Sequence, residues 1–187
     1  MDTSTSHLIF KEGKFSGWNA LNDTIMGGNS ISTCVNTAKG LLFKGEVVEK
    51  DGGFVSCRSS IFSPSLDLSG FRGIEIKLDG SGRTYKFALD ATNNDNFFTL
   101  SRFIKGNIRW VGSIATNKVG TTTKKILFSE LKPVIRAREI KMPLRLELSD
   151  IRRIQFLYSK FPCPGDSNPL FQFGPFSILI RSISAFS

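Results

Sequence analysis

The sequence predicts an all-β fold, an antiparallel jelly-roll β-sandwich, from three observations. Apolar and polar residues alternate over several short runs, clusters of Gly, Asn, Asp or Pro separate these runs at about 8–12-residue spacing, and helical periodicity is nearly absent. The connections are too short and too poor in helix to return the chain for parallel pairing, so we expect antiparallel strands. Two stacked sheets would hide the apolar faces of both.

The clearest alternation runs from Ile74 to Asp79, where Ile and Leu interleave with charged residues. A period of two places one strand face on a core and the other in water. The same pattern recurs in residues 41–47, 85–89, 154–158 and 176–180. The best helix candidate is a short turn over residues 129–132, which Pro133 would end.

The composition suits one globular domain. With 187 residues the chain can close a single hydrophobic core, and its seventeen Phe against two Tyr and two Trp suit packing between sheets. We expect residues 1–17 to form a partly ordered N-terminal segment and residues 18–187 to form the single β-sandwich domain. The sequence contains no apolar stretch of membrane-spanning length and no secretory or transit layout at its start, so we expect a cytoplasmic location.

The three cysteines, Cys34, Cys57 and Cys163, are odd in number and widely spaced. They match neither a disulfide framework nor a zinc site. We expect buried or idle reduced thiols.

The net charge of +9 is unevenly distributed. Residues 124–153 carry nine Lys or Arg against four acids, which leaves an excess of five positive charges in this segment. The ordinary interpretation is a set of solvated faces and loops. The alternative is contact with an acidic partner, so peripheral association with an anionic membrane face stays open. No nucleic-acid-binding motif accompanies the charge, and nucleic acid is not an expected partner.

Candidate catalytic groups are few. His7 is the only histidine, and it lies in the N-terminal segment, where we expect mobility rather than a positioned base. Five aspartates fall near predicted turns: Asp23, Asp51, Asp79, Asp90 and Asp95. Turn formation is the common reason for Asp at such places, and the sharper interpretation, a calcium site, lacks the D-x-D spacing of a dedicated loop. We expect no enzyme activity, no metal and no cofactor.

Several segments nevertheless follow a recognisable order. Residues 18–30, WNALNDTIMGGNS, resemble the W-x-x-x-N-D-x-x-M-G-G-x-S signature of the complex I intermediate-associated protein family. Residues 52–58, GGFVSCR, resemble its G-G-F-x-S-x-R step, and residues 80–85 resemble its G-D-G-R-x-Y turn. The resemblance extends to about Ile183. We therefore expect a bacterial or cyanobacterial-type member of this family.

The resemblance implies a galactose-binding-like β-sandwich that acts as an assembly factor for a respiratory or photosynthetic membrane complex. Its partners would then be protein subunits of that complex. Residues 128–138 resemble the family's F-x-x-F-x-P and R-G-R element, and residues 151–156 resemble its I-x-x-I-G-F strand. The sequence departs from these patterns at four positions: Ser81 replaces Asp, Leu131 replaces the second Phe, Ala137 replaces Gly, and Gln155 shifts the late strand pattern.

We expect the loops at one end of the sandwich to form a binding surface. Trp18 is expected to anchor the core, and Asn22 and Asp23 to hydrogen-bond the turn that follows them. Arg58 either pairs with a buried acid such as Asp23, which we favour, or lines an open pocket. A second hypothesis places the partner on the Pro-rich loop between Phe161 and Phe173. The candidate binding residues are Asn22, Asp23, Met26, Gly27, Gly28, Gly52, Gly53, Arg58, Arg83 and Phe171.

Two classes of function remain open. The leading expectation is a non-catalytic assembly factor or chaperone-like module, and the alternative is a carbohydrate-binding module. Sugar sites usually offer aromatic platforms, and the sequence has only Trp18, Trp110, Tyr85 and Tyr158 for that purpose besides its phenylalanines.

Overall fold

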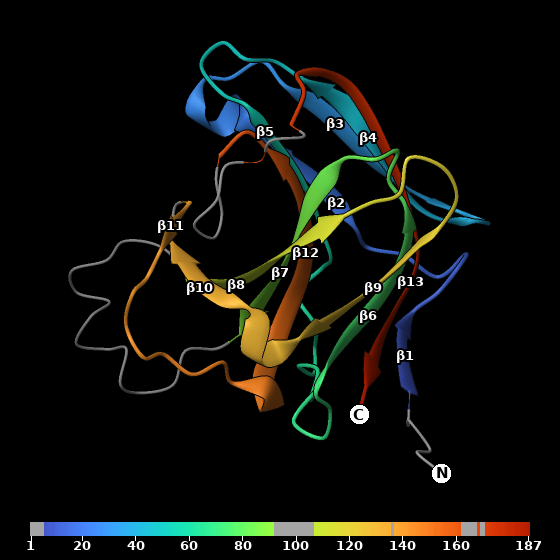
Figure 1. Ribbon diagram of the computed structural model, residues 1–187, viewed down its shortest axis with the longest axis vertical. Helices are drawn as coiled ribbons and strands as arrows, with labels where there is room; N and C mark the ends of the chain where they lie inside the picture. The colour runs from blue at the N-terminus through green and yellow to red at the C-terminus, as the bar shows by residue number, and fades with distance from the viewer. Residues whose placement is uncertain (1–5, 92–106, 136, 162–167, 169–170) are drawn as a thin grey trace.

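The computed structural model describes residues 6–91, 107–135, 137–161, 168 and 171–187, and they form two antiparallel sheets around a shared core (Figure 1). Sheet A has six strands in the described residues: β1 (Ser6–Phe10), β3 (Ile31–Thr37), β4 (Gly40–Val47), β6 (Gly73–Asp79), β9 (Thr122–Leu127) and β13 (Gly174–Phe186). Sheet B has seven: β2 (Asn19–Asn22), β5 (Phe54–Arg58), β7 (Thr84–Ala91), β8 (Arg109–Ala115), β10 (Lys132–Ile135), β11 (Arg138–Glu139) and β12 (Ile151–Ser159). The predicted all-β antiparallel sandwich is confirmed.

The strand order places the chain's two halves side by side in both sheets. Sheet A runs β3-β4-β13-β6-β9, with β1 also paired to β13, and sheet B runs β11-β10-β8-β7-β12-β5-β2. The described helical structure is limited to short 3-10 turns: η1 (Asp23–Met26), η3 (Phe128–Glu130) and η4 (Leu148–Asp150). The helical turn predicted at residues 129–132 is η3, shifted by one residue, and Pro133 lies inside the strand that follows it.

The predicted alternation matches the burial of the strands. In β6 the side chains of Ile74, Ile76 and Leu78 are fully buried, and Tyr85, Phe87 and Leu89 of β7 meet them from the other sheet in the same core. Fully burying one such side chain stabilises a fold by about 1.5–3 kcal/mol, so this shared layer is the main favourable contribution to folding.

The N-terminal residues take part in the sandwich. β1 pairs with β13, and Phe15 is almost fully buried. Trp18 is 6% exposed and packs its ring against Phe10 and Phe156, which confirms it as a core anchor.

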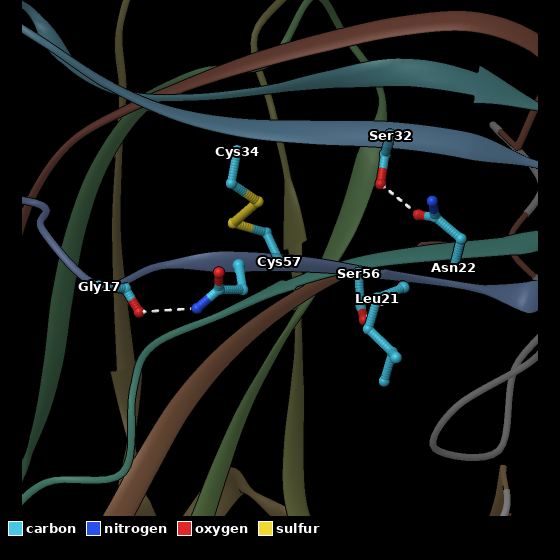
Figure 2. The surroundings of a disulfide bond; sticks show 8 residues. Gly17, Leu21, Asn22, Ser32, Cys34, Ser56 and Cys57 are labelled. Carbon is cyan, nitrogen blue, oxygen red and sulfur yellow. Dashed lines mark hydrogen bonds between the residues drawn. A yellow bond between two sulfur atoms is a disulfide. The ribbon is translucent and has the colours of Figure 1, made fainter. Parts of the chain in front are cut away.

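The expectation of reduced thiols is wrong for two of the cysteines. Cys34 on β3 and Cys57 on β5 form a disulfide that joins sheet A to sheet B (Figure 2). Their Cα atoms are 6.2 Å apart, within the usual range for such bonds. Sequence spacing could not indicate this pair, because the two strands belong to different sheets and meet only through the sandwich. Cys163 lies outside the described residues.

The pairing registers define two ends of sheet B. At one end β2 ends, β5 and β7 begin and β12 ends; we call it the signature end, because residues 22–30 and 52–54 lie there. At the other, β5 and β7 end and β8 and β12 begin; we call it the arginine end. Among the described helices, none is long and apolar enough to cross a membrane.

Candidate functional site

The carboxylate of Asp23 is the centre of the signature end. Asp23 is fully buried at the start of η1, and its two oxygens accept four hydrogen bonds from residues 30, 53 and 54. Ser30 donates from both its backbone N–H (2.9 Å) and its hydroxyl (2.6 Å), while the Gly53 N–H donates at 2.7 Å. A buried carboxylate needs such donors to replace water, so these contacts are what permit its burial.

Two glycines, which have no side chain, make space for this carboxylate. A Cβ atom added to Gly28 would lie 2.4 Å from the Asp23 carboxylate, and one added to Gly52 would lie 2.1 Å from it. Gly27 follows η1 with a φ of 86°, a left-handed conformation that glycine adopts without strain. We name Asp23, Gly28, Ser30, Gly52 and Gly53 the Asp23 cage.

The cage changes the acidity of its carboxyl group. Burial by itself raises the pKa of Asp23, but the hydrogen bonds from the Ser30 hydroxyl and from the backbone N–H groups outweigh burial and hold the pKa below its usual value. Asp23 is therefore an anion fixed in the structure and enclosed from solvent. It cannot contact a ligand without dismantling the turn, so its role is to hold the turn in place.

The turn held by the cage presents two apolar side chains outward. Ile25 is 66% exposed and Met26 is 71% exposed, on the turn between the buried Asp23 and Gly28. They are adjacent in sequence and both are large apolar side chains exposed to solvent. We name Ile25 and Met26 the apolar tip.

Asn22 links the signature turn to the other sheet. Its side-chain oxygen accepts a hydrogen bond from the Ser32 hydroxyl on β3, so Asn22 connects β2 of sheet B to sheet A (Figure 2). The expectation that Asn22 and Asp23 hydrogen-bond the backbone of the turn is confirmed for Asp23. For Asn22 the partner is a side chain on the facing sheet.

Arg83 and Phe171 meet at the same end of the sandwich, around Tyr158. The guanidinium of Arg83 lies 5.4 Å from the centre of the Tyr158 ring and donates to its hydroxyl at 3.3 Å. The Phe171 ring lies 4.8 Å from that of Tyr158 and 5.0 Å from that of Phe173. Arg83 thus packs against an aromatic cluster whose outermost member, Phe173, is 39% exposed.

Lys160 connects this aromatic cluster to the Asp23 cage. Its backbone N–H donates to the Gly53 carbonyl at 3.0 Å, and its stem fills the space that a Cβ on Gly53 would need. Its ammonium lies 5.4 Å from the Phe161 ring centre and 5.9 Å from that of Phe173. All the candidate binding residues except Arg58 therefore lie at the signature end. The remaining loop residues, 162–167 and 169–170, lie outside the described part of the chain.

The favoured pairing of Arg58 with Asp23 is wrong. Asp23 lies beside Phe54, the first residue of β5, whereas Arg58 is the last residue of β5, four residue steps or about 13 Å further along the strand. Asp23 satisfies its oxygens with Ser30, Gly53 and Phe54 instead. Arg58 lies on the outer face of sheet B at the arginine end, where its acidic neighbour is Asp90.

The other acids do not converge on a site. Asp79 accepts from Arg181 at 2.7 Å, Asp90 lies at the arginine end, and Asp51 has a φ of 59° in a turn. Asp95 lies outside the described residues. The part of the chain that the structure describes contains no group of three or more His, Cys, Asp or Glu able to hold a metal ion. His7 lies on β1 beside the Phe71 ring, opposite Ala185 of β13.

The basic stretch 124–153 surrounds an apolar hollow. Residues of this stretch between Phe128 and Leu148 line, together with Trp110, a hollow of about 730 Å³. Ile140, Met142 and Leu144 line its apolar wall, and Lys141 and Arg145 lie at the same hollow. Lys125 of this stretch forms an ion pair with Glu75 at 3.7 Å.

The aromatic side chains considered as sugar platforms lie in the core. Trp18 and Trp110 are 6% exposed, and Tyr85 and Tyr158 are fully buried. They cannot present a ring face to a saccharide on the surface.

A comparison with protein-family models identifies the chain. The model described as Complex I intermediate-associated protein 30 (CIA30) matches residues 8–180. The chain belongs to the CIA30 family. A search of curated proteins finds no match.

Two of the solved structures that resemble this CIA30-family chain are carbohydrate-binding modules. One is a family 11 module from Clostridium thermocellum in complex with a β-1,3-1,4-mixed-linked tetrasaccharide, with 17% identity, 99% of this chain and 96% of that chain covered, and a TM-score of 0.64. A family 30 module has 13% identity, 97% and 98% coverage, and a TM-score of 0.57. At these identities the likeness shows the fold, which is of the galactose-binding-like type that the sequence predicts.

The structure also places at the two ends of sheet B several residues that the sequence analysis did not select. Ser30 supplies two of the four hydrogen bonds to Asp23, and it is the final residue of the quoted signature, which was the signal available for it. Lys160 carries no motif, and neither do Arg109 and Arg153 at the arginine end. Their positions depend on strand pairing between distant segments.

Proposed function

We propose that this chain is a non-catalytic binding module that takes part in assembling a membrane-associated electron-transport complex. The observation that carries the proposal is the match of residues 8–180 to the CIA30 family model, whose description names complex I. The respiratory complex is the first candidate client, and a photosynthetic complex is the second.

The signature end supports this proposal. Its centre is buried and hydrogen-bonded, which suits a scaffold, while Ile25 and Met26 are exposed beside it. An aromatic cluster with Lys160 adjoins the cage, so one surface combines apolar and basic contacts. Such a surface fits a subunit whose complementary patch is apolar with acidic residues at its rim. The client subunit would dock on the apolar tip.

Affinity capture of a tagged chain from the cells that produce it tests the proposal. We expect subunits of a respiratory or photosynthetic electron-transport complex, together with partly assembled forms of that complex on native gels. Capture of proteins unrelated to any membrane complex, with normal complex levels in cells that lack the chain, would contradict it.

The basic stretch extends the proposal to the membrane surface. Lys132, Lys141 and Arg145 line the hollow of the 124–153 segment with its apolar wall, which suits peripheral contact with an anionic face. Co-sedimentation with vesicles containing phosphatidylglycerol should exceed that with neutral vesicles and should fall with salt. Equal sedimentation with both would remove the membrane from the proposal.

Carbohydrate binding is the second candidate function, and the resemblance to carbohydrate-binding modules favours it. The buried positions of Trp18, Trp110, Tyr85 and Tyr158 count against a stacking platform. Titration with a neutral β-1,3-1,4-mixed-linked tetrasaccharide separates the two candidates. The assembly proposal expects no saturable binding, whereas a carbohydrate-binding module would bind it.

A further inference from the structure

A cluster of charged side chains lies on the outer face of sheet B at the arginine end. Asp90 of β7 is directly opposite Arg153 of β12 and Arg109 of β8, and Arg58 of β5 is opposite Gln155 of β12. The neighbours of Asp90 and Arg109, Leu89 and Trp110, point into the core, so by the strand period these charged residues point outward. We name Arg58, Asp90, Arg109 and Arg153 the arginine cluster.

The charges of the arginine cluster do not balance. Three guanidinium groups surround one carboxylate, which leaves an excess of two positive charges. Arg153 and Arg109 both act electrostatically on Arg58, whose pKa is lowered, first by burial and then by Arg153. Among the described residues, no ion pair within 4.0 Å involves Asp90, and Arg109 donates to Gln155 at 3.2 Å instead. Half-buried, uncompensated positive charge is costly for folding alone, because burial strips it of water.

Two atoms of the cluster are buried and have no hydrogen-bond partner among the described residues. They are the Oδ1 atom of Asp90, which can only accept when ionised, and the Nε atom of Arg153, which can only donate. Native structures seldom leave such atoms unsatisfied, so each indicates a missing partner. The partner must offer one hydrogen-bond donor and one acceptor.

Both residues border a hollow of about 290 Å³. Its wall is partly apolar and partly polar, and consists of Ile61, Asp90, Ala91, Asn107, Ile108, Arg152 and Arg153. This volume is close to the lower end for ligand pockets, about 300 Å³, and suits a molecule the size of one sugar ring.

We propose that the arginine cluster and its hollow bind a small polyhydroxylated anion, a sugar that carries a carboxylate or a phosphate group. The anionic group would accept from Arg153 and Arg152, which line the hollow, and the planar guanidinium suits both kinds of oxyanion. Arg58 and Arg109 would add positive charge beside the hollow. A ring hydroxyl would donate to Oδ1 of Asp90, and Ile61, which is 54% exposed, would contact the apolar face of the ring. This site lies at the opposite end of sheet B from the apolar tip and does not depend on the proposed assembly role.

Isothermal titration of the full chain with glucuronate, glucose 6-phosphate and glucose tests the site. We expect saturable binding of at least one anion and at least about tenfold weaker binding of glucose, because hydrogen bonds to charged groups contribute more than neutral ones. The two anions distinguish a carboxylate from a phosphate as the recognised group. Absence of binding by both anions, or equal binding of glucose, would overturn the proposal.

Two substitutions with opposite expected effects guard against a folding artefact. R153Q should weaken anion binding by about tenfold or more. D90N keeps an Oδ1 acceptor for the ring hydroxyl but removes the cluster's only negative charge, so it should tighten anion binding by about threefold or more. A damaged fold cannot produce tighter binding, so this gain is the decisive result. R138Q, at an exposed position on β11, is the matched control and should leave the affinity unchanged. Weaker binding by D90N, or unchanged binding by R153Q, would contradict the site.

Discussion

The Oδ2 atom of Asp23 accepts a hydrogen bond from the backbone N–H of Gly53 at 2.7 Å, thirty residues further along the chain. This contact joins the two most specific motifs of the sequence, residues 18–30 and residues 52–58. Gly52 and Gly28 lie against the same carboxylate, and Ser30 completes its hydrogen bonds. The two motifs are therefore two parts of one structure, and its substitutions should behave accordingly.

G52A should destabilise the fold strongly. The added Cβ would lie 2.1 Å from Oδ2 of Asp23, so the carboxylate must move and lose its hydrogen bonds. We expect a loss of about 2–3 kcal/mol in the free energy of unfolding, measured by urea denaturation. G70A is the matched control, because a Cβ at Gly70 meets nothing within 4 Å. Equal stabilities of the two variants would show that the cage does not hold the turn.

Asp23 should make stability depend on acidic pH. Its pKa is lowered in the folded state by hydrogen bonds that outweigh burial, so the unfolded chain takes up a proton first as the pH falls. The carboxylate's contribution is then fully present above about pH 5 and is lost as the pH falls through the lower, folded pKa.

Comparison of the wild type with D23N isolates this effect. The difference between their unfolding free energies should be largest near neutral pH and should shrink steadily below about pH 4. Other acids with lowered pKa values, such as Asp79, are present in both proteins and cancel in the difference. A difference that stays constant down to about pH 3 would contradict the account of the cage.

Ala137 occupies a position that favours glycine. Its φ is 63°, in the left-handed region, and the family pattern has Gly there. A137G should raise the free energy of unfolding by up to about 1 kcal/mol, because glycine removes the strain of the Cβ atom. A20G, within the extended strand β2, should lower it by about 0.5–1 kcal/mol. Thermal denaturation of both variants measures this contrast, and destabilisation by A137G would refute it.

The two sheets should be covalently linked in the protein as isolated. Peptide mapping without reductant should find the Cys34 peptide joined to the Cys57 peptide, and reduction should lower stability by about 3 kcal/mol for a loop of this size. Since disulfides persist mainly in oxidising compartments, the location of the chain would then differ from the expected cytoplasm. Alkylation of all three cysteines without reductant would instead support reduced thiols.

The layers of this fold were predictable from sequence because alternation reports directly on burial. Residues 74–78 and 85–89 show a period of two, and their apolar members are the buried ones. The signature end was predictable as a cluster because its motifs match a family. The motifs did not indicate which of these residues bind a partner and which support the turn. In the structure Asp23 is enclosed, whereas Met26 is exposed.

The arginine end could not be predicted in the same way. Arg58, Asp90 and Arg153 belong to three strands that are far apart in sequence, and only the pairing registers bring them together. The strand period places Arg58 on the same face as Phe54 and Ser56, yet parity carries no information about which face points outward or which acid lies on the neighbouring strands. The Cys34–Cys57 bond was hidden for the same reason, because it crosses between sheets.

The contact role of the apolar tip has a matched set of variants. M26S removes a side chain that is 71% exposed and should leave the melting temperature unchanged, because surface substitutions seldom alter stability by more than about 0.5 kcal/mol. L8S removes an apolar side chain that is 48% exposed on β1, away from the tip, and serves as the control.

Affinity capture of the tagged wild type, M26S and L8S from native cells, with quantification of the recovered electron-transport subunits, tests the central claim most directly. The account predicts full recovery with the wild type and L8S and at least about tenfold lower recovery with a folded M26S, as expected for loss of a central interface residue. Equal recovery with all three proteins would contradict the tip as the docking surface, and absence of these subunits from the wild-type capture would contradict the assembly role itself.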